Sequence, residues 1–176
     1  MRTLALSLCL ALAPLARAQQ PAAPAPASCP DSLAVFLGGQ GFSAIELSQN
    51  TAKQFEVEAK LNGTVPLLLV VDTGASMSML DRDKLEAAGL EWEKTAIELS
   101  GFGGTQKLYS AQIANLAIGG AETGPMSIFG ADLSDLQATQ KRIGSRPVDG
   151  LIGADFLARY SAVIEVKHSM LYLRTR

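Results

Sequence analysis

The sequence has few of the residues that build metal centres, nucleophilic triads or nucleic-acid surfaces. It contains one histidine and two cysteines among 176 residues, and its formal net charge is −2. A zinc site takes about four ligands, mostly Cys and His, so no metal centre is expected. A Ser-His-Asp triad would have to use His168, and the sequence contains no Gly-x-Ser-x-Gly motif. Without a basic stripe, nucleic acid is not an expected partner.

The two cysteines do not suggest a disulfide framework. Cys9 lies in the apolar run at the N-terminus, and Cys29 follows a proline-rich stretch. A lone cysteine in an exported protein pairs with another chain or remains an idle thiol. A lipid anchor is disfavoured because Pro26 stands where a leucine-like residue would be needed. A catalytic role for Cys29 is disfavoured because nothing near it in the sequence could activate the thiol.

Long apolar runs are also scarce. The N-terminus has a positive Arg2, an apolar core from Leu4 to Leu15 and a small-x-small cleavage site at Ala16 to Ala18. This pattern is typical of a secretory signal peptide, so we expect residues 1–18 to be removed and the chain to be periplasmic or secreted. No second run is long enough to cross a bilayer, and no membrane contact is expected after cleavage.

The rest of the chain is predicted to be a leader followed by one domain. Residues 19–41 are rich in Pro and Ala and are predicted to form a leader and linker, whereas residues 42–176 are long enough for one domain with its own core. Short alternating segments separated by glycine turns predict an all-β, barrel-like domain with one or two short helices. The domain is expected to begin with a hairpin of strands 55–61 and 65–71 that turns at Asn62-Gly63.

Further strands and helices follow from the same patterns. A helix is predicted over 81–88 with Asp81 as its N-cap and Gly89 as its end, and a helical turn over 155–160. Residues 132–143 are predicted as a loop or short helix. The remaining strands are expected at 44–48, 96–100, 107–113, 115–118, 125–129, 161–166 and 170–173, with 115–118 paired to 125–129 around Gly119-Gly120.

The most informative segment is Val70-Val-Asp-Thr-Gly-Ala-Ser76, where an acid directly follows an apolar strand. A carboxylate at such a position is costly unless hydrogen-bond donors surround it. Small residues let backbone N–H groups and hydroxyls approach the carboxylate closely. The four residues that follow Asp72 are all of this kind: Thr73, Gly74, Ala75 and Ser76.

This segment resembles the Asp-Thr-Gly signature of aspartic proteases. A second segment, Leu151-Ile152-Gly153, resembles the hydrophobic-hydrophobic-Gly element that packs beside the catalytic loop in that family. The order of elements from Gln54 to Leu173 is similar to that of the single-lobed, retropepsin-like enzymes, and the signal peptide favours a bacterial, exported member. The resemblance implies a closed acid-protease barrel with Asp72 as the catalytic residue and with no metal or cofactor.

The resemblance also implies a homodimer. The chemistry of the family needs two facing carboxylates, and the Asp-Thr-Gly sequence occurs once in this chain. Two chains related by a two-fold axis would each contribute one Asp72. Facing carboxylates retain one proton between them, so the ionised partner can activate water while the protonated partner polarises the scissile carbonyl.

By the same resemblance, the neighbouring residues support the site. Thr73 would hold the two loops together across the axis, the Gly74 N–H would bond the carboxylate, and Ser76 would bond its outer oxygen. A glycine-rich tip suits a lid that bends over an extended peptide. The expected flap and substrate-binding residues are Gly101, Phe102, Gly103 and Gly104.

Other conspicuous residues have simpler interpretations. Asp149 is interpreted as a turn residue rather than a second catalytic acid, because no small hydroxyl residue follows it. Asp155 is interpreted as a cap of the following helical turn, and His168 as a solvated turn residue. Trp92 is expected to pack rather than to bind a ligand. The Asp-Thr-Gly segment itself could be a structural turn.

These observations predict an aspartic endopeptidase that cleaves extended polypeptide segments as a homodimer. One alternative is a catalytically idle domain of the same fold that binds peptides or a partner protein. Another is self-processing, with the leader or the 132–147 segment as the cleavage site.

Overall fold

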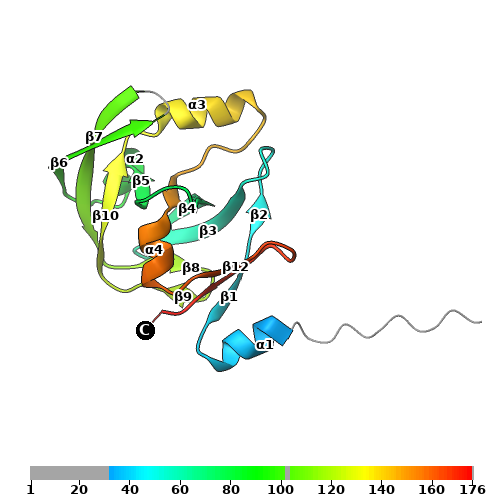
Figure 1. The fold of residues 1–176 in the computed structure, drawn as a ribbon. Coiled ribbons are helices and arrows are strands. Elements are labelled where there is room, and N and C mark those ends of the chain that lie inside the picture. The colour runs from blue at the N-terminus through cyan, green and yellow to red at the C-terminus, as the bar shows by residue number, and fades with distance from the viewer. Residues whose placement is uncertain (1–31, 102–103, 176) are drawn as a thin grey trace, which may run out of the picture.

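The computed structural model describes residues 32–101 and 104–175 and is dominated by short strands (Figure 1). Four helices interrupt the strands in the described part of the chain. The helices are α1 (Ser32–Gly39), α2 (Arg82–Ala87), α3 (Ser134–Arg142) and α4 (Ala154–Arg159). The strands are β1 (Ser43–Glu46), β2 (Ser48–Gln49), β3 (Phe55–Leu61), β4 (Val65–Val71), β5 (Met79–Asp81), β6 (Trp92–Gly101), β7 (Gly104–Ile113), β8 (Leu116–Ile118), β9 (Ala121–Glu122), β10 (Met126–Ala131), β11 (Gly150–Ile152), β12 (Val163–Glu165) and β13 (Met170–Leu173).

The strands form one large sheet and one small sheet. The small sheet has the order β1-β13-β12, so the first strand of the domain pairs with the last. The large sheet has the order β6-β7-β10-β5-β11-β4-β3-β8-β9, and β2 also pairs with β3. Within the residues that the structure describes, β6 and β9 each have one neighbour on this path. The mostly-β architecture predicted from sequence is confirmed, but the strand pairing follows an open path instead of a closed barrel.

The β3–β4 hairpin carries the Asp-Thr-Gly segment. Asn62 and Gly63 both adopt positive φ, 48° and 75°, and the Thr64 N–H donates to the Leu61 carbonyl at 3.1 Å, which closes the predicted turn. The last five residues of β4, 67–71, are buried. Burial on both faces explains why this strand is almost wholly apolar.

The pairing around β10 differs from the sequence-based prediction. The Gly119-Gly120 turn joins the short strands β8 and β9, which pair with each other. Strand β10 pairs instead with β7 and, in parallel, with β5. Strands β6 and β7 are also longer than predicted, and their pairing continues to Gly101 opposite Gly104. The prediction that 115–118 pairs with 125–129 was therefore wrong.

The N-terminal part of the described chain contains a helix that the sequence patterns did not predict. Helix α1 spans Ser32–Gly39, within the segment predicted to be leader and linker. Leu37 is buried, whereas Val35 and Phe36 are exposed. Figure 1 shows α1 at the opposite end of the molecule from α3. None of the helices in residues 32–101 and 104–175 has the length and apolarity needed to cross a membrane.

Asp81 connects three elements at the end of β5. It is 6% exposed, and its Oδ1 accepts the Asp83 N–H at 2.9 Å, which caps α2 as predicted. Its Oδ2 accepts the Leu133 N–H at 3.2 Å and the Gln137 amide at 3.4 Å. The same carboxylate therefore anchors α2 and the start of α3.

We predict that Asp81 makes stability depend on pH. Burial raises the pKa of Asp81, and this desolvation outweighs the N–H groups of Asp83 and Leu133, which favour the ionised form. The folded state then holds the proton more tightly than the unfolded chain, so this contribution to stability is lost as pH rises through the raised pKa.

Urea unfolding between about pH 3 and pH 7 measures this effect. The free energy of unfolding of the wild type should fall relative to that of Asp81→Asn as pH rises, because the amide does not titrate. Carboxylates far from Asp81 contribute equally to both proteins and cancel in the difference, whereas Asp83 and Asp132 interact with Asp81 and leave a smaller residual effect. A difference that is constant with pH, or that changes in the opposite direction, would contradict the prediction.

Candidate active site

Strand β11 holds the loop that follows β4. It lies between β4 and β5, parallel to β4 and antiparallel to β5. Beyond the end of β4, the Asp72 N–H donates to the Ile152 carbonyl at 2.9 Å. The Ala154 N–H donates to the Ala75 carbonyl at 2.8 Å. Both ends of the Asp72–Ala75 loop are therefore held by residues 152–154, which come much later in the chain.

The Asp72 carboxylate is half-buried and is oriented by its own loop. The Gly74 N–H donates to Asp72 Oδ1 at 2.9 Å, and the Ala75 N–H donates to the Asp72 carbonyl at 3.2 Å. A Cβ at Gly74 would lie 3.2 Å from Asp72 Oδ1, so glycine leaves room for this bond. The donor expected from sequence at Gly74 is thus present.

The two hydroxyl residues of the segment do not take part in the hydrogen bonds that orient the Asp72 carboxylate. Thr73 and Ser76 are exposed, and neither side chain makes a hydrogen bond to another residue in the described part of the chain. The bond expected between Ser76 and the outer oxygen of Asp72 is not formed in the single chain. The role expected for Thr73 involves a second chain and remains a prediction.

Gly153 packs directly against the Asp72 loop. A Cβ at this position would lie 2.8 Å from the Ala75 carbonyl oxygen and 2.8 Å from the Met77 carbonyl group. Real Cβ atoms do not approach backbone so closely, so only glycine fits. Leu151 and Ile152 precede it in β11, and Ile152 is buried in the main core. The Leu151-Ile152-Gly153 segment therefore packs beside the loop that carries Asp72.

Ser78 joins the loop to α4, a role that sequence patterns did not reveal. It is 3% exposed, its Oγ accepts the Gly153 N–H at 2.8 Å, and its hydroxyl donates to Asp155 Oδ1 at 2.6 Å. The same Asp155 oxygen accepts the Phe156 N–H at 2.7 Å. Asp155 therefore lies inside the first turn of α4 and accepts one of its free N–H groups, whereas the N-cap position itself is Gly153, which has no side-chain cap.

We predict that Ser78→Ala destabilises the protein by about 1–3 kcal/mol, because it leaves the buried Gly153 N–H without an acceptor. The matched control is Ser127→Ala, which removes an exposed hydroxyl that accepts from the exposed Gln112 amide. The control should change stability by less than about 0.5 kcal/mol. Urea unfolding of both variants measures the difference, and equal stabilities would contradict the importance of this bond.

Asp149 is occupied by structural contacts. Its Oδ2 accepts the Leu68 N–H at 2.8 Å, and its Oδ1 lies 3.2 Å from Lys84 Nζ. Its backbone carbonyl accepts the Asp81 N–H at 2.7 Å. These bonds tie β4, β5 and α2 together, which agrees with the structural interpretation of Asp149.

His168 and Trp92 also have structural surroundings. His168 is exposed beyond the end of β12 and contacts the Glu165 carboxylate. Trp92 packs edge-on against Tyr109, with the ring centroids 4.5 Å apart. No group of His, Cys, Asp and Glu side chains suited to a metal ion occurs within residues 32–101 and 104–175.

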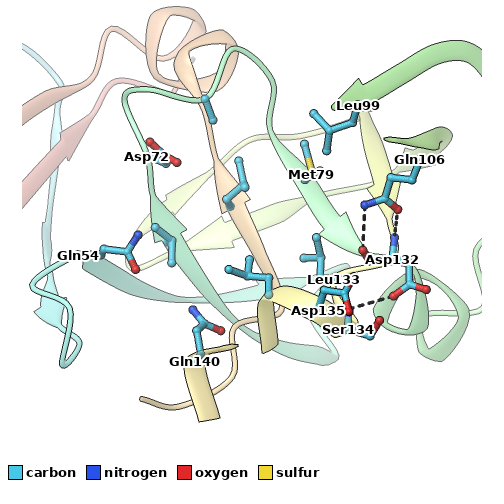
Figure 2. A pocket seen from close by; sticks show the side chains of 14 residues that line it. Gln54, Asp72, Met79, Leu99, Gln106, Asp132, Leu133, Ser134, Asp135 and Gln140 are labelled. Carbon is cyan, nitrogen blue, oxygen red and sulfur yellow. Dashed lines mark hydrogen bonds between the residues drawn. The ribbon is translucent and has the colours of Figure 1, made fainter. Parts of the chain in front are cut away.

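A cleft of about 470 Å³ opens beside Asp72 (Figure 2). Its walls come from the Asp72 loop, from the β6 and β7 strands through Leu99 and Gln106, and from β11 and α3. The lining residues are Gln54, Val70, Asp72, Ala75, Met79, Leu99, Gln106, Asp132, Leu133, Ser134, Asp135, Leu136, Gln140 and Leu151. A carboxylate beside a mostly apolar cleft of this size is an arrangement suited to binding a ligand.

The predicted flap is described only in part. Phe102 and Gly103 lie outside the described residues, whereas Gly101 ends β6 and pairs with Gly104, which begins β7. Strand residues next to them face the cleft, since Leu99 and Gln106 both line it. The hairpin that leads to the predicted flap therefore borders the same cleft as Asp72.

The wall opposite Asp72 is polar and ordered by hydrogen bonds. The Gln106 amide donates to the Asp132 carbonyl and accepts the Asp132 N–H, both at 3.0 Å (Figure 2). The Ser134 hydroxyl and N–H bond to the Asp132 carboxylate and lower the pKa of Asp132. This wall therefore carries an ionised carboxylate at neutral pH and a rigid connection between β7 and α3.

Comparisons with known proteins agree with this geometry. The model of the aspartyl protease family matches residues 57–156, which include Asp72, β11 and the start of α4. This match covers more than half of the chain, and the protein belongs to the aspartyl protease family. No curated protein matches the sequence significantly.

Three solved structures are similar to this chain, and the first of them shows that the fold is retropepsin-like. The structure of a retropepsin-like aspartic protease from Rickettsia conorii is 21% identical, with a TM-score of 0.52, and the alignment covers 76% of this chain and 90% of that one. The EIAV protease complexed with the inhibitor HBY-793 is 18% identical, with a TM-score of 0.47 over 67% of this chain and 98% of that one. The retroviral protease-like domain of Ddi1 from Leishmania major is 19% identical, with a TM-score of 0.46 over 68% of this chain and 87% of that one.

Proposed function

We propose that this protein is an aspartic endopeptidase that hydrolyses peptide bonds in extended polypeptide segments as a homodimer. The observation that carries the proposal is the position of Asp72. It directly follows the buried strand β4, the Gly74 N–H orients its carboxylate, and it borders the cleft that the β6–β7 hairpin also lines. A substrate bound along the β6 and β7 strands would pass over this carboxylate.

Within the described residues, the other acids of one chain are not placed to face Asp72. Asp132 and Asp135 line the cleft on the wall opposite Asp72, where Ser134 bonds the Asp132 carboxylate (Figure 2). Asp149 and Asp155, the carboxylates of the β11 region, are engaged by backbone N–H groups, Lys84 and Ser78. Neither Asp149 nor Asp155 is among the residues that line the cleft. A second Asp72 from another copy of the chain would supply the missing carboxylate, and Thr73, exposed beside it, would lie at the junction of the two loops.

The proposed mechanism needs two carboxylates and one water. Two facing carboxylates about 3 Å apart do not both ionise readily, so the pair retains one proton. The ionised partner takes a proton from the water as it attacks the scissile carbonyl carbon, and the protonated partner donates to the carbonyl oxygen. The tetrahedral intermediate then collapses as the leaving nitrogen is protonated. The Gly74 N–H keeps the carboxylate oriented throughout.

A mixed peptide library tests the proposal. The purified mature chain is incubated with the library from pH 4 to pH 7 at several protein concentrations, beside Asp72→Asn, and the products are identified by mass spectrometry. We expect cuts by the wild type whose specific rate rises with concentration as dimers form. Equal cleavage by both proteins would indicate a contaminant. No cleavage by either protein at concentrations where dimers are present would favour a peptide-binding domain of the same fold.

We also propose that residues 1–18 direct export and are then removed, which places the enzyme in a periplasm or outside the cell. N-terminal sequencing of the mature protein identifies the cleavage site. If the N-terminus changes when Asp72 is replaced, the protein processes its own leader. The 132–147 segment is less suited to self-processing, because α3 occupies most of it and the proposed site accepts extended chain.

A further inference from the structure

The cleft beside Asp72 contains a buried hydrogen-bond donor without an acceptor. Gln140 lies on α3, is 3% exposed and lines the cleft (Figure 2). Its Oε1 accepts the Val148 N–H at 2.9 Å. Its Nε2 has no hydrogen-bond partner among the residues that the structure describes.

The orientation of this amide is fixed by the protein. The Val148 N–H is buried and requires an acceptor, so the oxygen of Gln140 must face it and the NH₂ group must face away. A buried donor without an acceptor is costly, and a ligand that supplies one recovers that cost on binding. The Nε2 atom itself has almost no surface open to the cleft, so an acceptor reaches it when the neighbouring lining side chains move aside, and Gln140 then donates to that acceptor.

The other walls restrict what this acceptor can be. The lining includes Asp72, Asp132 and Asp135, and neither Lys nor Arg is among its residues. An anionic acceptor such as a glutamate side chain would be repelled by these carboxylates. Most of the remaining lining is apolar, including the buried Val70 and Met79. A neutral acceptor carried on an apolar stem would pair with the Gln140 donor, avoid repulsion by the carboxylates and pack against the apolar lining.

We infer that this cleft selects a peptide carrying a carboxamide side chain, glutamine or asparagine, whose oxygen accepts a hydrogen bond from Gln140 Nε2. This inference rests on the proposed function, because it takes the ligand to be a peptide bound beside Asp72. Gln140 acts as a specificity-determining residue, since it touches substrate away from the scissile bond.

The test uses pools of blocked octapeptides in which one position is fixed as Gln, Asn, Met, Leu, Glu or Lys. Met and Leu have about the size of Gln and Asn but lack the amide. The wild type should process the best Gln or Asn pool about tenfold faster, as kcat/KM, than the matching apolar pool. The Glu pool should be the poorest.

The diagnostic variant is Gln140→Glu. It keeps an oxygen for the Val148 N–H and, in its ionised form, replaces the NH₂ donor by an acceptor, so the comparison is made at the highest pH at which the wild type is active. It should lower kcat/KM for the carboxamide pools about tenfold and leave the apolar pools within about twofold. The matched control is Thr139→Glu, which adds the same charge to an exposed position of α3 that does not line the cleft. The control should retain the wild-type preference.

Binding separates this inference from the proposed activity. The same pools are titrated against Asp72→Asn with Gln140 intact and against Asp72→Asn combined with Gln140→Glu. A preference for carboxamide peptides that requires Gln140 supports the inference even if no chain cleaves peptides, in which case the proposed activity alone fails. Cleavage or binding without such a preference overturns the inference. A preference for the Lys pool also overturns it, because the acidic residues would then determine selection.

Discussion

Asp72→Asn is expected to abolish peptide hydrolysis while leaving the fold intact. The amide keeps an oxygen for the Gly74 N–H, which lies 2.9 Å from Asp72 Oδ1, but it can neither accept the proton of water nor share one with a facing carboxylate. We expect kcat to fall at least about 10³-fold, with little change in the free energy of unfolding, since Asp72 is only half-buried. Single-peptide kinetics and urea unfolding of both proteins provide the two measurements.

Mixing the variant with the wild type tests whether the site is shared between chains. If subunits exchange at random, an equal amount of Asp72→Asn leaves half of the wild-type chains in fully competent dimers, so activity should fall to about one half. A ninefold excess of variant should reduce it to about one tenth. Activity that is unaffected by the variant, in a mixture shown to exchange subunits, would mean that one chain forms the whole site.

Gly153→Ala is expected to damage both the fold and the site. The new methyl group would lie 2.8 Å from the backbone of Ala75 and of Met77, and neither carbonyl can rotate away without moving the Asp72 loop. Overpacking of this kind costs about 1–3 kcal/mol. Because the same loop positions the carboxylate, we also expect kcat/KM to fall more than about tenfold.

The matched control is Gly120→Ala. Gly120 also follows a turn position, but a Cβ there meets nothing within 4 Å and its φ is not positive. Its effect on stability should be below about 0.5 kcal/mol, and its kinetics should match those of the wild type. Thermal unfolding and kcat/KM for the three proteins provide the comparison. Wild-type kinetics in Gly153→Ala would show that the loop tolerates displacement.

Sequence patterns predicted the elements that are determined by residues close together in the chain. The Asn62-Gly63 turn needs positive φ at two adjacent residues, and Asp81 caps α2 by accepting the N–H two residues further on, so both were visible in a short stretch of sequence. Strand β10 could not be placed this way. Its partners β5 and β7 are chosen by packing, and the glycine turn before it already joins the short β8 and β9 strands. Helix α1 escaped prediction because its hydrophobic residues do not form one helical face.

The site residues also differ in whether their contacts are local in sequence. The Asp72 loop was predictable because its carboxylate and its donor at Gly74 are two residues apart. Ser78 was missed because its partner Gly153 is 75 residues away in sequence, and nothing in Met77-Ser78-Met79 indicates that contact. Gln140 was missed because its significance lies in an unpaired buried donor, which depends on the position of Val148 and on the cleft. Contacts of this kind can be recognised only after the chain is folded.

The insertion of β11 between β4 and β5 has a consequence for how and when the site is assembled. Strands β4 and β5 are close in sequence, but the element that joins them comes near the end of the chain. Contacts of high sequence separation form slowly, because the loop between them must close first. Until then β4 has one unpaired edge, and an apolar edge of this kind promotes aggregation. A chain ending before Gly150 would contain an intact Asp-Thr-Gly sequence but would lack the strand that fixes it.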